Sequence, residues 1–211
     1  MIVSISKHRL FIIKKKRVRE SMSIFETIKR RRSIGKVTAQ RPTREQIEHI
    51  LQAATHAPNH HKVEPWRFFV LAGRAREELG DIMFTSLAAR LEDTTSDKAQ
   101  AMLEKERNKP LRAPVLIVVA ALHTTQPNVL DIENIEAVAA ATENMLLTIE
   151  EMGLAAQWRT GDAAYDPCVK RWLGLTEKDA IVAFLYVGYA DMPSVERHPT
   201  PVGEKTTWLG W

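Results

Sequence analysis

Three stretches decide how the fold of this chain is interpreted: RRRS at residues 30–33, APNHH at residues 57–61 and EPWRFFV at residues 64–70. The first closes a short predicted helix, the second follows one further predicted helix, and the third opens a predicted strand. Each stretch is unspecific by itself. Together they place a cation cluster and a polar turn before a strand, so they are the first candidates for a ligand-binding site.

Two helix starts flank the cation cluster. Ser23 and Glu26 have the spacing of a capping box, in which the serine hydroxyl accepts from the third helical amide and the glutamate reaches back. The helix that they begin is predicted to run to about Arg32. Thr43 and Gln46 repeat the pattern, and apolar residues then recur at helical spacing.

The rest of the chain alternates between predicted helices and strands. Further helices are predicted over residues 74–90, 97–108, 133–152 and 166–173, and strands over 66–71, 115–121, 155–159 and 181–187. The strand at 115–121 is a continuous apolar run, as expected when both faces are buried. The long helix carries small residues at 137 and 139–141, which suit either an ordinary core helix or a helix at a dimer interface.

Composition limits the class of protein. With 211 residues, 45% hydrophobic and 27% charged, the chain can bury one good core. No apolar run approaches the roughly 18 residues that cross a bilayer, so we expect no membrane association. A single cysteine, Cys168, excludes an intrachain disulfide and a cysteine-based metal site. These features predict a cytoplasmic protein.

The charge is concentrated at the N-terminus. Residues 7–19 hold seven lysines and arginines, which exceeds the net charge of +4 for the whole chain. The apolar stretch 10–13 is shorter than the 7–15 residues of a signal-peptide core. We expect residues 1–21 to be a basic, disordered extension and Met22 to be an alternative start. A weaker hypothesis is that this arm makes the chain a nucleic-acid-associated binding module. We expect no nucleic-acid partner, because the sequence shows no basic face along the whole chain.

The arginine cluster suits a phosphate. A phosphomonoester carries about −1.5 to −2 charge near neutral pH, and arginine binds it with a planar fork that a serine hydroxyl can supplement. The alternative is that these arginines only complement the dipole at a helix C-terminus.

Two further segments offer polar groups to a ligand. The turn at 57–61 has adjacent histidines but no helical i,i+4 pair and no third ligand nearby, so we predict no metal. It can present polar tips to a ligand or be a plain surface loop. The segment 157–162 ends a strand and turns through Gly161, where backbone N–H groups are accessible to a ligand. The alternative is an ordinary β-turn.

Other cofactor and catalytic motifs are missing from the sequence. It has no Gly-x-Ser-x-Gly elbow, no Gly-x-Gly-x-x-Gly and no P-loop pattern. An arginine-rich phosphate site without those loops favours a mononucleotide cofactor that side chains hold.

Seven short motifs, in this order, resemble the FMN-dependent nitroreductase family, and more closely its compact branch of NAD(P)H nitroreductases. The resemblance covers roughly residue 22 to the end of the chain. Its landmarks are Arg31-Arg32-Ser33, Ala57-Pro58-Asn59-His60, Pro65-Trp66-x-Phe68, Arg112-Ala113-Pro114, Glu143-Asn144, Trp158-Arg159-Thr160-Gly161 and Phe184-Leu185-Tyr186-Val187-Gly188.

The resemblance implies an α+β fold in which helices wrap a small, mostly antiparallel sheet. It further implies an intertwined homodimer with two FMN sites at the interface, and one FMN-binding domain over residues 22–211. The proline-punctuated tail after residue 191, which ends in tryptophans, is expected to pack on another surface such as the partner subunit.

The resemblance also implies the binding residues. Arg31 and Ser33 would hold the FMN phosphate or ribityl chain, and Arg32 would lie against the ring edge. The remaining FMN residues would be His56, Pro58, Asn59 and His60 from the partner subunit, Trp158, Arg159, Thr160 and Gly161 near flavin N5, and Lys205 near the phosphate. The NAD(P)H residues would be Thr148, Ile149, Glu150, Glu151, Met152 and Gly153. No protein residue is expected to be catalytic.

The activity implied is a ping-pong oxidoreductase. NADH or NADPH would reduce the flavin at N5, and a nitroaromatic, quinone or enone would then be reduced, with the chemistry carried by the cofactor. An alternative is an FMN protein of the same fold that catalyses dehalogenation or flavin fragmentation, for which residues 85–108 would set access. Glu64 departs from the family, where a glutamine is common, and a carboxylate near the ring would disfavour the reduced anion.

Overall fold

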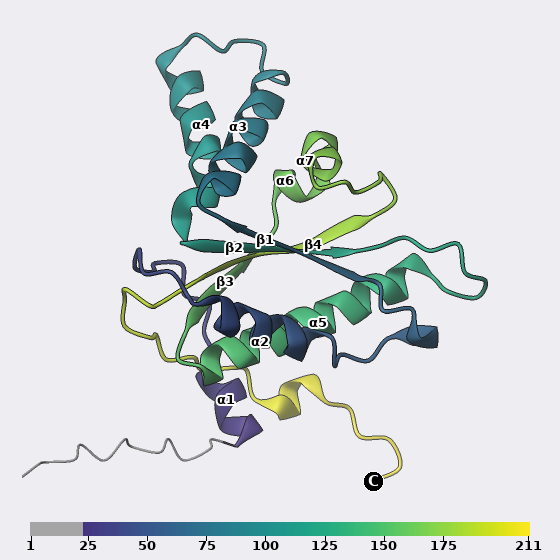
Figure 1. Ribbon diagram of the computed structural model, residues 1–211. Coiled ribbons are helices and arrows are strands. Elements are labelled where there is room, and N and C mark those ends of the chain that lie inside the picture. Colours follow the sequence, from purple (N-terminus) through teal and green to yellow (C-terminus); the bar gives the residue numbers. More distant parts are fainter. Residues whose placement is uncertain (1–22) are drawn as a thin grey trace, which may run out of the picture.

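The computed structural model describes residues 23–211 (Figure 1). The predicted N-terminal extension, residues 1–21, and the proposed start at Met22 lie outside these residues. The α-helices are α1 (Ile24–Arg30), α2 (Arg44–Ala54), α3 (Arg74–Ala88), α4 (Asp97–Arg107), α5 (Asp131–Glu151), α6 (Asp162–Tyr165) and α7 (Pro167–Trp172). The strands are β1 (Trp66–Ala72), β2 (Val115–Ala121), β3 (Ala155–Arg159) and β4 (Ala180–Gly188), and short 3-10 turns are η1 (His60–Lys62), η2 (Lys109–Arg112) and η3 (Val202–Lys205).

The four strands form one antiparallel sheet in the order β1-β2-β4-β3. All residues of β2 are buried, as the continuous apolar run predicts, because helices cover both faces of the sheet (Figure 1). The predicted α+β fold with a small antiparallel sheet is confirmed. β3 lies at one edge of the sheet, where the chain after α1 joins it through a parallel bridge between Ser33 and Ala156.

One face of the sheet carries α2 and α5. Their apolar side chains, among them Ile50, Val138 and Met145, pack against the inward residues of β2 and β4. The Asn144 side chain of α5 also donates to the Ala53 carbonyl of α2, at 3.3 Å. The long predicted helix is therefore a core helix. The surface of α5 that does not face the sheet is still compatible with a dimer interface.

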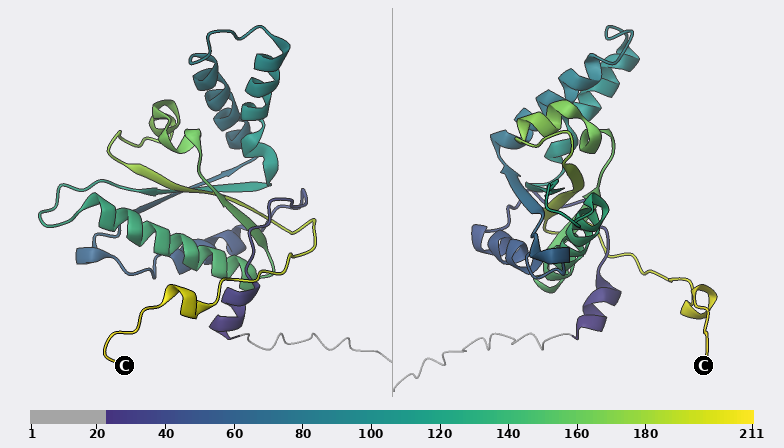
Figure 2. Two further views of the ribbon diagram at one scale, coloured as in Figure 1. Left: turned by 180° about the vertical axis from the view of Figure 1, so that it is seen from behind. Right: turned by 90° about the vertical axis from the view of Figure 1, so that its right-hand side faces the viewer.

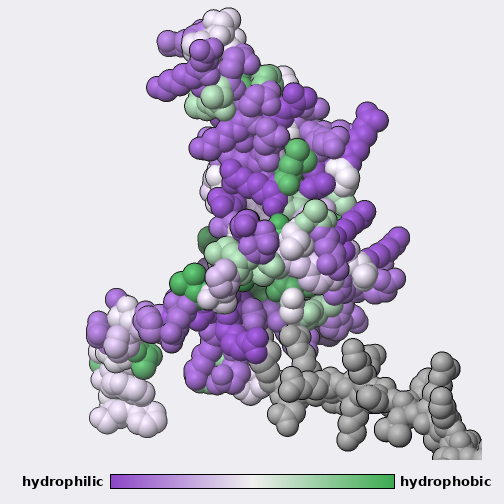
Figure 3. Space-filling model, turned by 90° about the vertical axis from the view of Figure 1, so that its left-hand side faces the viewer, coloured by the Kyte–Doolittle hydropathy of each residue, from purple (hydrophilic) through white to green (hydrophobic). Residues whose placement is uncertain are grey.

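The other face carries α3, α6 and α7, with Leu79, Met83 and Val169 buried against β2 and β4. The helices α3 and α4 form a hairpin that projects from the sheet, and its surface is largely hydrophilic (Figures 1 and 3). The two helices pack closely at Gly80, where an added Cβ would lie 2.2 Å from the Arg107 carbonyl oxygen. Glycine is required there by space rather than by backbone conformation.

The predicted helix starts are largely correct. Thr43 and Gln46 form the full capping box of α2. Ser23 accepts from the Glu26 amide, but the reciprocal half is absent because the Glu26 carboxylate pairs instead with Lys29 at 3.3 Å. The first helix ends at Arg30 and not at about Arg32, since the chain becomes extended at Arg31 to reach the edge of β3.

The C-terminal segment extends away from the sheet on the side opposite the α3–α4 hairpin (Figure 2). Trp211 is 97% exposed, and its ring meets that of Trp208 edge-on at 5.6 Å. Ile24 and Phe25 of α1 are also exposed. These apolar surfaces are not covered by any part of residues 23–211.

Candidate functional site

A cavity of about 330 Å³ lies where β3 ends, between α3, η2 and β4. Its apolar walls come from Leu79 and Met83 of α3 and from Phe184 of β4. Its polar lining comprises the cationic side chains of Lys109, Arg112 and Arg159, the phenol of Tyr186, and the residues Thr160 and Gly161. Three of the residues predicted to bind FMN therefore line one cavity.

The register of the sheet places these side chains. Arg159 pairs with Phe184, and Gln157 pairs with Tyr186 across the β3–β4 ladder, so all four side chains share one face. Arg159 Nε donates to Gln157 Oε1 at 2.9 Å, which orients the guanidinium along the strand end. Trp158 points to the opposite face, packs against the α2–α5 core and donates through Nε1 to the Val182 carbonyl at 3.0 Å. It supports the strand and does not line the cavity.

The backbone after β3 exposes donors. Gly161 has φ +96, a conformation that side chains rarely adopt, so the sharp turn requires glycine. The amide groups of Thr160 and Gly161 donate to no backbone carbonyl or side chain of residues 23–211. Both residues line the cavity. A carbonyl or ring nitrogen of a ligand could accept from these two N–H groups.

The electrostatics of the cavity favour an acceptor-rich ligand. Lys109 is paired with Glu106 of α4, whereas Arg112 and Arg159 form no ion pair with a carboxylate of the described chain. Burial raises the pKa of Tyr186, although Arg112 and Arg159 act in the opposite direction. The phenol is therefore protonated at neutral pH and can donate a hydrogen bond.

The arginine cluster lies at the other end of β3. Arg31 is the C-cap residue of α1. Its Nε lies 3.4 Å from Glu143 Oε1 of α5, and one fifth of the Arg31 side chain is exposed. Ser33 is exposed beside Ala156. The backbone at Gly35 lies so close to β3 that an added Cβ would be 2.4 Å from Gln157 Oε1. The predicted phosphate residues and the cavity are thus joined by one strand edge.

Arg32 has a different environment from the one predicted. Its Nε donates to the Val195 carbonyl at 2.7 Å, and its Nη1 donates to the carbonyls of Lys29 and Arg31. Three backbone acceptors therefore hold this guanidinium, which fastens the start of the C-terminal segment to α1. These contacts give no support to the prediction that Arg32 lies against a flavin ring.

Pro58, Asn59 and His60 line a separate hollow of about 390 Å³ beside α5. His60 Nδ1 lies 2.8 Å from Glu133 Oε2, and this hydrogen bond, followed by that of the Leu130 amide, lowers the pKa of Glu133. Asn59 Oδ1 accepts from the Glu64 amide at 2.9 Å. The predicted residues of this loop are thus placed together, but in a hollow that shares no lining residue with the cavity at Gly161.

The loop that follows has an unusual backbone. His61, Lys62 and Glu64 have φ values of +51, +54 and +49, where residues other than glycine are uncommon. The Glu64 side chain is exposed. His56 is exposed as well, and its imidazole has no hydrogen bond or ion pair within residues 23–211.

The segment predicted to contact NAD(P)H forms the end of α5 and the turn after it. Ile149 is buried in the core, Thr148 Oγ1 donates back to the Asn144 carbonyl, and Glu150 lies 3.6 Å from Arg30 Nε. Gly153, at φ +72, ends the helix. Lys205 is exposed in η3, and no ion pair connects it with the other predicted residues.

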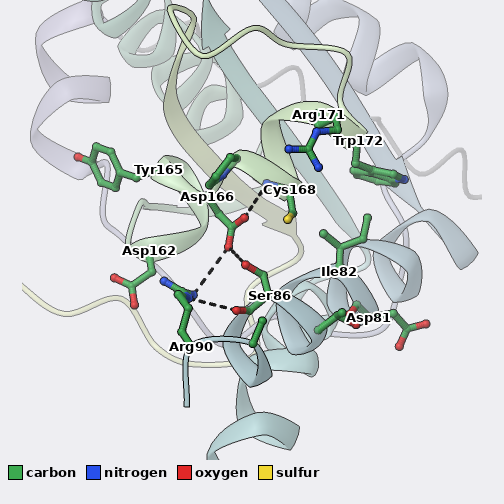
Figure 4. A pocket seen from close by; sticks show the side chains of 13 residues that line it. Asp81, Ile82, Ser86, Arg90, Asp162, Tyr165, Asp166, Cys168, Arg171 and Trp172 are labelled. Carbon is green, nitrogen blue, oxygen red and sulfur yellow. Dashed lines mark hydrogen bonds and ion pairs between the residues drawn. The ribbon is translucent and has the colours of Figure 1, made fainter. Parts of the chain in front are cut away.

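Another hollow, with a volume of about 850 Å³, lies between α3, α6 and α7 (Figure 4). At its base the buried carboxylate of Asp166 accepts from the Ser86 hydroxyl and from the Cys168 amide, and Arg90 Nη2 lies 3.7 Å away. None of the residues predicted to bind FMN lines it. Asp166 follows α6, caps α7 and bonds to Ser86 of α3, so the base of this hollow is a structural junction of three helices.

The sequence analysis missed the apolar lining of the cavity and three of its polar lining residues, Lys109, Arg112 and Tyr186. Arg112 and Tyr186 lie inside motifs that carry the family resemblance, so a signal for them was present. Lys109 belongs to no motif, and only the packing of η2 against α3 brings it to the cavity.

The comparisons with known proteins agree with this architecture. Residues 28–189 match the sequence model of the Nitroreductase family. A relative from Escherichia coli K12, "Putative NAD(P)H nitroreductase YdjA", is 34% identical over 167 residues, which cover 79% of this chain and 88% of the relative. The chain therefore belongs to the nitroreductase family.

Solved structures show the same fold. A nitroreductase-like family protein from Bacillus cereus superposes with a TM-score of 0.76 at 29% identity, over 90% of this chain and 97% of that one. An FMN and NADPH-dependent nitroreductase, NfnB, from sphigopyxis sp. strain HMH superposes with a TM-score of 0.70 at 21% identity, over 90% and 100% of the two chains. The second likeness concerns the fold alone.

Two further features of residues 23–211 concern membranes and metal ions. No helix there is long and apolar enough to cross a membrane. No group of three or more histidine, cysteine, aspartate or glutamate side chains is arranged to hold a metal ion in that part of the chain.

Proposed function

We propose that this protein is an FMN-dependent NAD(P)H oxidoreductase of the nitroreductase type, whose FMN-binding domain spans residues 22–211. The observation that carries the proposal is the cavity at the end of β3. It combines two backbone N–H groups without acceptors, at Thr160 and Gly161, with the guanidinium groups of Arg112 and Arg159. Family membership and the names of the relatives support the same activity.

The residues present suit a flavin mononucleotide. The cavity offers the N–H donors of Arg112, Arg159, Thr160 and Gly161, which match the carbonyl oxygens and ring nitrogens along one edge of an isoalloxazine. Phe184 and Met83 give it apolar walls for the ring faces. Arg31 and Ser33, at the far end of β3, offer the guanidinium and hydroxyl donors that a phosphate needs.

The edge of β3 sets the distance between the two ends of the site. Ser33 bridges to Ala156, and the ring-binding amides begin at Thr160, four residues further along. At a rise of about 3.3 Å per residue this is roughly 13 Å. A ligand with a phosphate at one end and a planar ring at the other, joined by a flexible chain, can bridge this distance along the strand edge.

In this proposal the chain binds and orients, and the cofactor reacts. When bound, the flavin accepts a hydride at N5 from NADH or NADPH and then reduces a nitroaromatic, a quinone or an enone. Arg112 and Arg159 favour negative charge at the ring edge, because fixed cations and dipoles in a partly dry site stabilise charge that develops there. The two amides hold the ring in register with the strand end.

We further propose that the active form is an intertwined homodimer. Pro58, Asn59 and His60 line a hollow apart from the cavity in the same chain, so they can reach a flavin only from a second copy. The exposed apolar residues of α1 and of the C-terminal segment give such a copy a surface to cover. The partners of the dimer are then small molecules, the reductant and the electron acceptor.

The test is the visible absorption spectrum of the purified protein before and after anaerobic addition of NADPH. A flavin spectrum that bleaches on reduction, and recovers when a nitroaromatic or quinone is added, is the expected result. A colourless protein that takes up no added FMN would overturn the proposal. Repeating the reduction with NADH gives the preference between the two nucleotides.

A further inference from the structure

The hydroxyl of Tyr186 has no hydrogen-bond partner in residues 23–211, and its side chain lines the cavity at Gly161. The residue is 8% exposed and lies in the β4 strand, on the face that lines this cavity. Among the described residues, only Arg76 Nε is a fully buried side-chain polar atom without a partner, so the Tyr186 hydroxyl is accessible from the cavity. A phenol hydroxyl that the protein itself does not use is available to donate to a ligand there.

The other two tyrosines of the chain differ from it. Tyr189 Oη bonds to Gln46 Oε1 at 3.1 Å, and Tyr165 is 78% exposed, so water can satisfy its hydroxyl. Tyr186 alone among the three is buried, lines a cavity and lacks a protein acceptor. Its β4 neighbour on the same face, Phe184, shows that a ring without a hydroxyl is compatible with this wall.

No hydrogen-bond acceptor within residues 23–211 is used by the Tyr186 hydroxyl. The charged groups that act on it are Arg112 from η2, Arg159 from β3 and Glu106 from α4. Glu106 is already paired with Lys109. The protonated phenol can therefore donate a hydrogen bond to an acceptor that enters the cavity from outside.

We propose that Tyr186 is a positioning residue that donates a hydrogen bond to an acceptor atom on the ring edge of the bound flavin. This inference rests on the proposed function. The ring is assigned to this end of the site because the cavity lies beside the Thr160 and Gly161 amides, whereas the arginine and serine suited to a phosphate lie at the start of β3.

The test compares FMN with riboflavin, which has the same ring and no phosphate. Dissociation constants for both are measured by flavin fluorescence on apo-protein of the wild type and of the Tyr186→Phe, Arg31→Ala and Tyr189→Phe variants. Tyr186→Phe should weaken both flavins by the same factor, about two- to tenfold for one neutral hydrogen bond. Arg31→Ala should weaken FMN and leave riboflavin unchanged. Tyr189→Phe, which removes a phenol hydroxyl outside the cavity, is the matched control and should change neither.

A second readout reports on the ring itself. The loss of a donor at the ring edge disfavours the electron-rich reduced flavin, so the midpoint potential of Tyr186→Phe should be more negative than that of the wild type. Unchanged constants and potential in Tyr186→Phe would overturn the inference, since the cavity would then hold only water at this hydroxyl. A loss confined to FMN would overturn it as well, because it would place Tyr186 at the phosphate. A wild type that binds neither flavin would instead overturn the proposed function.

Discussion

We expect removal of the Asp166 side chain to lower the free energy of unfolding substantially. Its carboxylate is 4% exposed and caps α7 by accepting from the amides of Cys168 at 2.8 Å and Val169 at 3.4 Å. It also accepts from the Ser86 hydroxyl of α3. One carboxylate therefore begins one helix and joins it to another.

The magnitude follows from these contacts. Replacement of an N-cap aspartate by alanine costs about 1 kcal/mol, and the hydrogen bond that the half-buried Ser86 hydroxyl donates to the charged carboxylate contributes about 1–3 kcal/mol. The Arg90 pair adds little, since that side chain is half exposed and the two groups are 3.7 Å apart. Asp166→Ala should therefore lower the free energy of unfolding by about 2–4 kcal/mol. For a chain of this length that corresponds to a fall in Tm of roughly 4–16 °C.

The assay is thermal and urea unfolding of the wild type, Asp166→Ala, Ser86→Ala and the double variant, all as apo-protein at one concentration. The double-mutant cycle should give a coupling energy of at least 0.5 kcal/mol between the two side chains. Asp162→Ala is the control, because this exposed aspartate lines the same hollow without a hydrogen bond to the described residues. A cost below about 0.5 kcal/mol for Asp166→Ala, or a coupling of zero, would refute the reasoning.

Three further outcomes are expected. Arg31→Ala should weaken FMN binding by about 10- to 150-fold, because it loses a charge-assisted contact of about 1.5–3 kcal/mol. Arg30→Ala is the control and should change FMN binding little. Equal losses in the two variants, measured by fluorescence titration, would show that Arg31 is not part of the site. Burial raises the pKa of Asp179, but hydrogen bonds from two amides and a threonine hydroxyl outweigh this and hold the pKa below its ordinary value. The ionised carboxylate therefore stabilises the fold above the pKa of the unfolded state, and this stabilisation is lost as the pH falls through the lowered pKa of the folded state. Asp179→Asn should accordingly be less stable than the wild type at pH 7, with a smaller difference in urea unfolding at pH 3. Gly80→Ala should destabilise the α3–α4 hairpin by about 1–3 kcal/mol through overpacking against a backbone carbonyl, while Gly203→Ala, with open space around it, should leave the Tm unchanged.

Local signals account for the elements that the sequence predicted well. The strands β1 to β4 and the helices α2 to α5 follow from apolar periodicity and capping residues, which act within a few positions of one another. The short α6 was not predicted, because four residues give no periodicity to detect. The return hydrogen bond from Glu26 in the first predicted capping box is absent for another reason: the Glu26 carboxylate pairs with a second local partner, Lys29.

The site residues divide along the same line. Gly161 was predicted as a turn with accessible amides, and the structure places those amides in a cavity without an acceptor. The family resemblance implied that Arg32 lies against the flavin ring, yet its guanidinium donates to the Val195 carbonyl, 163 residues away. A contact of that separation leaves no trace in local spacing.

What the sequence alone determined is the family, the order of its helices and strands, and the residue types that suit a phosphate and a flavin ring. Those depend on short motifs and on periodicity, which are properties of neighbouring residues. Only the tertiary structure decided which of them meet. The antiparallel register of β3 and β4 sends Arg159 and Tyr186 to one face of the sheet and Trp158 to the other, and the packing of η2 on α3 adds Lys109 and Arg112. The physical reason is that side chains alternate along a strand, so a binding surface is defined only after the strands have paired.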